Sequence, residues 1–298
     1  MRIRSTITAK ALIAGAGVAG MLGVSAGTAT AQFYKGKTLN VLINYGAGGN
    51  TDVQGRSVLR FMEKYIPGQP RTVVRNMPGA GGIVATNYIV KAAKKDGSLM
   101  GIFTIAGMAE LTQAKELTVS HKDLIFIGAI GQQQIGHVRK DVLEGGINKP
   151  TDFLKVTKVF KSAGHAPTSS PIFHTGVPTP DGGLVHSDTV SKDIPTFLAL
   201  YQAKYGAGKK PEPLAWGTYR KFAQMRQVLR ILVLPKGAPK QAVADLRSAW
   251  IKTTKDKGYL AEYRKQNASD LVPLGGEDAQ AVVNDLLTIK PEVQKFMQ

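Results

Sequence analysis

Glycine-rich segments that follow apolar runs contain the residues best suited to bind a small anion. The first, residues 45–52 (Tyr-Gly-Ala-Gly-Gly-Asn-Thr-Asp), lies between an apolar run and a predicted helix. Free backbone N–H groups at a helix start attract anions, and glycine lets a ligand come close to the backbone. No Gly-Lys-Ser or Gly-Lys-Thr follows, and the glycine spacing differs from a dinucleotide fingerprint. The segment indicates either an anion site or an ordinary tight turn.

Two further glycine turns have the same character. Residues 75–82 (Arg-Asn-Met-Pro-Gly-Ala-Gly-Gly) join a predicted strand to a predicted helix, and residues 161–166 (Lys-Ser-Ala-Gly-His-Ala) follow another predicted strand. Loops that follow neighbouring parallel strands gather at one edge of the sheet. The first two turns should therefore share a rim that faces an anion.

Patterns typical of catalysis or metal binding are not evident. The sequence has no cysteine and no Gly-x-Ser-x-Gly motif. Its five histidines are far apart and lack carboxylates at metal-ligand spacing. Among them, His165 stands in a candidate binding turn. We expect no enzyme activity, no metal and no cofactor.

Alternating strand and helix patterns surround these turns. Asn50, Thr51 and Asp52 are good N-cap residues for a helix that follows the first turn. That helix should bury one apolar stripe: Val58, Leu59, Met62 and Ile66. Strands are predicted at 38–44, 72–75, 99–104 and 124–130, and a second helix at 83–94. The alternation predicts an α/β fold with a largely parallel sheet.

The second half of the chain is less regular. Residues 136–139 and 158–163 predict strands and residues 151–155 a short helix, but residues 166–193 show no convincing period. A structureless loop of that length is uncommon inside a compact domain. Regular patterns return as helices at 194–205, 216–227, 238–255, 259–266 and 277–287, and as a strand at 230–234.

The first 31 residues have the features of a secretory signal peptide. Three basic residues (Arg2, Arg4 and Lys10) precede the apolar stretch 11–24 and the small-x-small triplet 29–31. An apolar stretch of 14 residues is shorter than the roughly 20 that a membrane-spanning helix needs. We expect cleavage after Ala31, no membrane insertion afterwards, and a periplasmic mature chain of 267 residues.

The net charge favours contact with anions without indicating nucleic acid. The formal charge of +18 includes three cations of the signal segment, which leaves +15 on residues 32–298. The basic residues are scattered, with no long basic run and no interleaved aromatic residues. We therefore expect no nucleic-acid partner, and regard weak attraction of anionic ligands as a secondary effect of the charge.

The order of these motifs resembles the receptor family of the tripartite tricarboxylate transporters, the Bug or TctC-type periplasmic receptors. The similarity rests on the turn at 45–52, the Asn-Met-Pro-Gly-Ala-Gly-Gly turn at 76–82, and Asp96-Gly97 before the run at 99–104. It continues through 158–165 and returns over 232–250, where a strand, Pro-Lys-Gly-Ala-Pro and a helix match.

This resemblance implies an α/β, two-lobed periplasmic-binding-protein fold of type II (Venus flytrap). One lobe would comprise residues 32–135 with the C-terminal part of 230–298, and the other residues 136–229. It implies a non-catalytic receptor that captures a small carboxylate and passes it to membrane transporter subunits.

The resemblance also implies a set of ligand-binding residues. The glycines would offer backbone N–H groups, and Thr104 and Ser162 hydroxyl groups, each bond to a charged group contributing roughly 1.5–3 kcal/mol. Carried over by position, the set is Gly46, Ala47, Gly48, Gly49, Asn50, Thr51, Asp52, Thr104, Ala106, Gly107, Ser162, Ala163, Gly164 and His165.

Two departures from the family pattern matter. Tyr45 stands where the family usually has proline or an apolar residue. After the turn at 162–165, a further strand, helix and strand of the family pattern are missing, and the chain passes almost directly into the irregular stretch 171–193. We therefore expect an incomplete, shortened second lobe with weak closure.

Two alternatives share most of these features. A sensor that hands a ligand-bound state to a signalling partner would have the same pocket and a different docking surface. An exported α/β hydrolase would need a nucleophile and base that are distant in the sequence. A receptor explains the signal segment, the glycine turns and the basic charge together.

Overall fold

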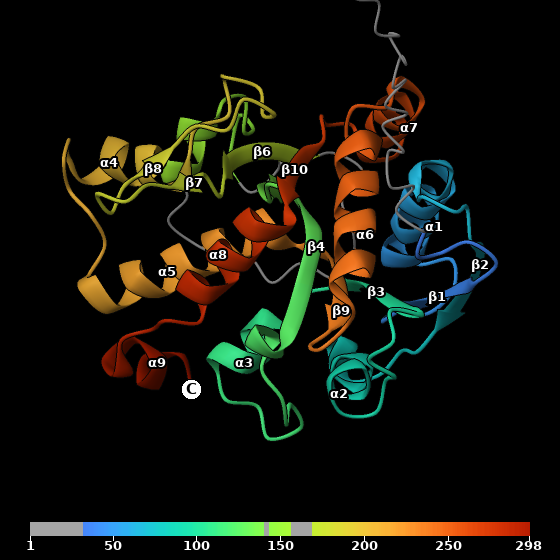
Figure 1. The fold of residues 1–298 in the computed structure, drawn as a ribbon. Coiled ribbons are helices and arrows are strands. Elements are labelled where there is room, and N and C mark those ends of the chain that lie inside the picture. The colour runs from blue at the N-terminus through green and yellow to red at the C-terminus, as the bar shows by residue number, and fades with distance from the viewer. Residues whose placement is uncertain (1–31, 140–142, 156–168) are drawn as a thin grey trace, which may run out of the picture. The chain divides into compact units, whose positions relative to one another are not determined.

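The computed structural model describes residues 32–139, 143–155 and 169–298 (Figure 1). A six-stranded sheet lies at the centre of the larger part of the chain. Its strand order is β10-β4-β9-β3-β1-β2. β1 (Thr38–Ile43) pairs in parallel with β2 (Arg71–Asn76) and β3 (Leu99–Thr104). β4 (Leu124–Gly131) completes the set of strands predicted in the first lobe, and all four are confirmed.

The direction of the later strands corrects the expectation of a largely parallel sheet. β9 (Arg230–Pro235) inserts between β3 and β4 and runs antiparallel to both. β10 (Val272–Gly275), which the sequence did not predict, is antiparallel to β4. The N-terminal end of β9 consequently lies at the carboxyl end of β3.

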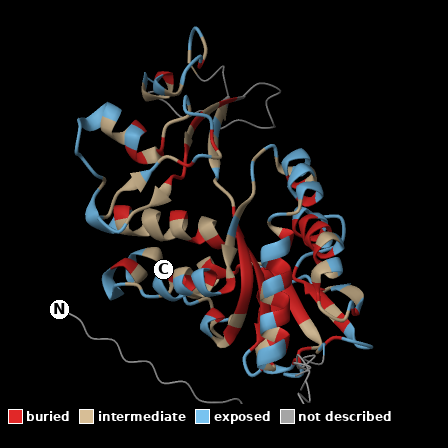
Figure 2. Cartoon of the chain, turned by 45° about the horizontal axis from the view of Figure 1, so that its top comes forward, coloured by how far each residue is buried: buried red, intermediate tan, exposed pale blue. Residues whose placement is uncertain are grey.

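Helices cover both faces of this sheet. On one face lie α1 (Asn50–Met62), α6 (Lys240–Thr253) and α7 (Lys257–Asn267). On the other lie α2 (Ile83–Lys91), α3 (Gly107–Leu111) and α8 (Gly276–Leu286). Figure 2 shows the sheet buried between helices whose outer faces are exposed. None of the described helices is long and apolar enough to cross a membrane.

The core explains why several strands are apolar throughout. Along β9, Leu232 and Leu234 pack against the α1 face, while Ile231 and Val233 pack against the α2 face. A strand buried on both faces needs apolar residues at every position. The predicted stripe of α1 is confirmed, since Val58, Leu59, Met62 and Ile66 are all buried.

The second part of the chain has smaller sheets. β5 (Ile135–Arg139) pairs with β6 (Ser169–His174), and β7 (Val177–Pro178) pairs with β8 (Leu184–Val185), both antiparallel. The expectation that 166–193 has no regular structure is therefore wrong for its described part. Strands of two residues are too short to show an alternating pattern. The strand expected at 158–163 lies outside the described residues.

Aromatic side chains tie this second part together. α4 (Phe197–Tyr205) and α5 (Pro213–Met225) follow β8. The Phe197 ring stacks on Tyr219 at 4.3 Å and meets Phe173 of β6 edge-on at 5.5 Å. Neither large core cluster draws a side chain from the described residues between 135 and 205. Less apolar area is buried there, so this region should be the less stable part.

Limited proteolysis should therefore cut the chain between residues 136 and 205 before it cuts elsewhere. A low protease concentration on the mature protein, with fragments identified by mass spectrometry, should give early cuts in that region and a protected six-stranded sheet. Equal resistance of the two regions would contradict the expectation of an incomplete second lobe.

His174 is a buried titratable group of the second part. Its side chain has no exposed surface, its Nδ1 accepts a hydrogen bond from the Gly176 amide at 3.1 Å, and its ring meets His186 edge-on at 4.4 Å. Burial, and secondarily the charge of His186, lowers the pKa of His174 to about 4. The folded protein therefore keeps this ring neutral where an unfolded chain would protonate it.

Stability should consequently fall as the pH drops from about 6.5 towards 4. In this window the unfolded state binds more protons than the folded state, so the free energy of unfolding rises with pH. Urea unfolding at a series of pH values should show this slope in the wild type and a smaller slope in His174→Asn. An unchanged slope in the variant would assign the pH dependence to other groups.

Candidate anion-binding site

Asn44 joins the ends of β1 and β3. This fully buried side chain donates from Nδ2 to the Thr104 carbonyl at 2.8 Å and accepts at Oδ1 from the Thr104 amide at 2.9 Å. The Thr51 hydroxyl of α1 lies 2.8 Å from the Thr104 hydroxyl. These contacts place the start of α1 beside the carboxyl end of β3, as the strand-turn-helix order predicts.

The Asp52 carboxylate holds the first turn by hydrogen bonds within the protein. Its Oδ2 accepts from the Gly48 amide at 2.9 Å, and its Oδ1 accepts from Arg56 Nε and from Asn76 Nδ2, each at 2.8 Å. Burial opposes its ionisation, but the hydrogen bonds from Asn76, Gly48 and Arg56 together lower the pKa of Asp52. Asp52 is thus an internal carboxylate whose oxygens are already engaged by the protein.

The helix cap differs from the expectation. The N-cap of α1 is Gly49, which has no capping side chain, whereas Asn50, Thr51 and Asp52 were predicted for that role. The prediction was wrong because Asp52, at the third helical position, reaches back to the Gly48 amide. The helix start is therefore held without a side chain over its first amides.

The outer side of this turn is open. Residues 45–50 are exposed, and a Cβ built on Gly46 or Gly48 would meet no heavy atom within 4 Å. Within the described part of the chain, the amides of Ala47, Asn50 and Thr51 donate no hydrogen bond. Unpaired amides at the N-terminus of a 13-residue helix favour an anion.

The second glycine turn packs against the first. Asn76 Nδ2 donates to the Tyr45 carbonyl at 2.8 Å, and the Tyr45 hydroxyl donates to the Gly81 carbonyl at 3.3 Å. Gly82 has φ +95°, and a Cβ there would lie 2.2 Å from Asn44 Nδ2. Glycine is therefore required at Gly82, and the two turns meet at one edge of the sheet, as predicted.

The third segment, 104–107, presents less surface. Ala106 and Gly107 are buried, and a Cβ on Gly107 would lie 3.1 Å from Met225 Sδ. The partly exposed Thr104 is the side chain that this segment offers to a ligand. Ala106 and Gly107 could contribute through their backbone alone.

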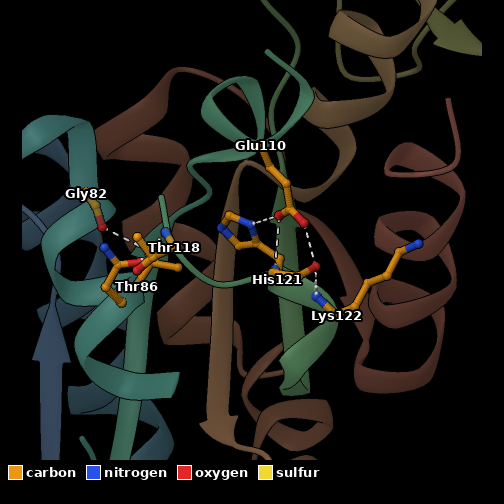
Figure 3. A network of polar contacts seen from close by, with 8 residues as sticks. Gly82, Thr86, Glu110, Thr118, His121 and Lys122 are labelled. Carbon is orange, nitrogen blue, oxygen red and sulfur yellow. Dashed lines mark hydrogen bonds and ion pairs between the residues drawn. The ribbon is translucent and has the colours of Figure 1, made fainter. Parts of the chain in front are cut away.

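A partly buried polar network holds α3, the short helix that begins in this segment (Figure 3). Glu110 Oε2 lies 2.5 Å from His121 Nδ1 and accepts from the His121 amide at 3.0 Å, while Oε1 accepts from the Ser120 hydroxyl at 2.5 Å. Burial raises the pKa of Glu110, but these hydrogen bonds outweigh it and lower the pKa. The ionised carboxylate therefore holds α3 against the loop before β4.

The remaining predicted residues, Ser162, Ala163, Gly164 and His165, lie outside the described residues. Among the residues that the structure describes, no group of three or more His, Cys, Asp or Glu side chains is arranged to hold a metal ion.

Sequence reasoning did not single out Arg230. It begins β9 directly opposite Thr104 of β3 and is only 6% exposed. The available signal was an arginine at the start of a run of apolar residues, Ile231 to Leu234. The direction of β9, which brings Arg230 to this edge, was not predictable from that run.

Similarity to known proteins is local in sequence. No protein-family model matches the chain. Protein BugT of Bordetella pertussis (strain Tohama I) is 33% identical over 71 residues, which are 24% of this chain and 21% of BugT. The match thus spans about a fifth of the length of this curated relative.

Similarity in structure extends over most of the chain. A TctC solute-binding protein from Polaromonas aligns with a TM-score of 0.55 at 17% identity, over 85% of this chain and 96% of that one. The R. palustris protein Rpa4515, solved with adipate, has a TM-score of 0.58 at 14% identity, over 89% and 98%. Together with the BugT match, these structures confirm the resemblance inferred from the turns: the chain has the two-lobed α/β fold of the Bug and TctC-type solute-binding proteins.

Proposed function

We propose that this protein is a periplasmic solute-binding receptor that captures a small carboxylate. The observation that carries the proposal is the open turn at 45–50. There, amides at the start of α1 that have no acceptor among the described residues lie beside the Thr51 and Thr104 hydroxyl groups. The presence of adipate in Rpa4515, which shares the fold, supports a carboxylate as the ligand class.

The ligand carboxylate would be bound mainly by backbone groups. The amides of Gly46, Ala47, Asn50 and Thr51 would donate hydrogen bonds, with Thr51 and Thr104 adding hydroxyl donors. Asp52 would act by holding the turn open, because its own negative charge is neutralised by internal donors. Each hydrogen bond to a charged group contributes roughly 1.5–3 kcal/mol, so three or four of them supply about 5–12 kcal/mol, part of which offsets the cost of association.

We propose that the second lobe, residues 136–229, supplies the opposite wall through Ser162, Ala163, Gly164 and His165. The first lobe would be residues 32–135 together with the C-terminal part of 230–298. After removal of residues 1–31 the receptor would deliver its ligand to membrane transporter subunits. No reaction is proposed for the site, and transfer of the intact solute is its output.

A thermal-shift screen of the mature protein from Gln32 tests this function. A panel of dicarboxylates, tricarboxylates and amino acids, each with its uncharged amide as the matched control, should contain one or two acids that raise the melting temperature by a few degrees. At a hundredfold excess over Kd, binding to the folded state adds about 2.7 kcal/mol. A clean melt with no shift for any acid would contradict the proposal.

The same measurement on the Thr104→Val variant tests where the acid binds. Valine keeps the shape of threonine and removes the hydroxyl group, so the affinity for an active acid should fall by about tenfold. Thr118→Val, at an exposed loop position, is the matched control and should bind as the wild type does.

A further inference from the structure

Arg230 occupies the edge of the sheet where the glycine turns lie. It opens β9, with Thr104 of β3 and Ile130 of β4 as its partners in register. Because Leu232 and Leu234 point to the α1 face, the two-residue period of a strand puts the Arg230 side chain on that face too. The start of α1 and the guanidinium of Arg230 thus belong to the same side of the same sheet edge.

The Arg230 side chain is largely buried and has no partner among the residues that the structure describes. The residue is 6% exposed, its Nε is buried, and no hydrogen bond or ion pair links its guanidinium to any residue in the described part of the chain. Its electrostatic neighbours are Arg226, which is also a cation, and the hydroxyl groups of Tyr263 and Tyr45. No carboxylate of the described chain neutralises it.

This charge cannot be removed by loss of a proton near neutral pH. Burial, and then the repulsion of Arg226, lowers the pKa of Arg230 to about 10, which leaves the guanidinium charged at pH 7. A buried charge without a counter-ion destabilises a folded protein. Asp52, on the same edge, shows the opposite arrangement, since three donors surround its carboxylate.

The spacing of the strands relates Arg230 to the amides of α1. β3 lies between β1 and β9, so the turn after β1 and the start of β9 are two strand spacings apart, about 10 Å. Thr104 stands between them, in hydrogen-bond contact with Thr51 on one side and opposite Arg230 on the other. A short acyclic ligand with an acid group at each end can reach both.

We propose that Arg230 binds the second carboxylate of the ligand, so that the receptor selects dicarboxylates over monocarboxylates. This inference rests on the proposed function, since the first carboxylate occupies the turn at 45–50. A guanidinium pairs with a carboxylate through two parallel hydrogen bonds, which gives Arg230 both the charge and the geometry for the task. Arg226 adds positive potential near the site. Its Nε donates to the Gln132 carbonyl at 3.3 Å, a neutral acceptor that leaves the charge of Arg226 in place.

Calorimetric titration with adipate and hexanoate separates the two acid groups, since these acids share a six-carbon chain and differ by one carboxylate. The proteins are the mature wild type, Arg230→Met, Arg230→Lys and Arg71→Met. Arg71 is an exposed arginine at the N-terminal end of β2, at the sheet edge away from the glycine turns. Its substitution controls for the loss of one positive charge.

The wild type should bind adipate at least tenfold more tightly than hexanoate. Arg230→Met should weaken adipate binding by about tenfold to a hundredfold and leave hexanoate binding unchanged, which also shows that the variant is folded. Arg230→Lys should keep part of the preference, and Arg71→Met should change neither affinity by more than about twofold.

Two results would overturn the inference in different ways. Equal adipate affinity in the wild type and Arg230→Met would refute the role of Arg230 and leave the receptor function standing. If the wild type binds neither adipate nor hexanoate, and no acid of the thermal-shift panel, the receptor function is refuted together with the inference that rests on it.

Discussion

The paired hydrogen bonds between Asn44 and the backbone of Thr104 are the contact on which the candidate site depends. They join the carboxyl ends of β1 and β3 inside the protein, where leaving either amide group unpaired would cost about 1–3 kcal/mol. Thr51 reaches Thr104 because of this junction, and Gly82 must be glycine because the Asn44 amide fills the space beside it. The Asn44 side chain thus contacts the strand end beside α1 and the second glycine turn at once, and the bonds of Asp52 and Asn76 add to this junction.

At this sheet edge the negative group has partners within the protein, whereas the positive groups are left for a ligand. Asp52 is neutralised from within, by Gly48, Arg56 and Asn76, and therefore shapes the turn without offering a charge to a ligand. The α1 amides and Arg230 are positive features that the described chain leaves uncompensated. An edge built in this way is selective for anions because the protein supplies the donors and the ligand supplies the negative charge. The scattered net charge of the chain is secondary to this local arrangement.

The sequence predicted the parts of the fold that a local period encodes. The strands β1 to β4, the buried stripe of α1 and the meeting of two glycine turns follow from apolar runs and turn residues. The direction of β9 could not be predicted, because an apolar run buried on both faces has the same pattern in a parallel and in an antiparallel strand. The roles of Asp52 and Arg230 depend on partners such as Asn76 and Thr104, which are distant in sequence. Similarly, β7 and β8 are too short to leave a pattern.

Backbone amide chemical shifts of the ¹⁵N-labelled mature protein, titrated with a dicarboxylate that raises its melting temperature, test the central claim most directly. A carboxylate bound at the turn should shift the amides of Gly46, Ala47, Asn50 and Thr51 strongly downfield, as expected for N–H groups that acquire a charged acceptor. The Gly48 amide, already bonded to Asp52, should move less. Saturable shifts confined to other elements, with these four amides unmoved, would contradict a carboxylate site at this sheet edge.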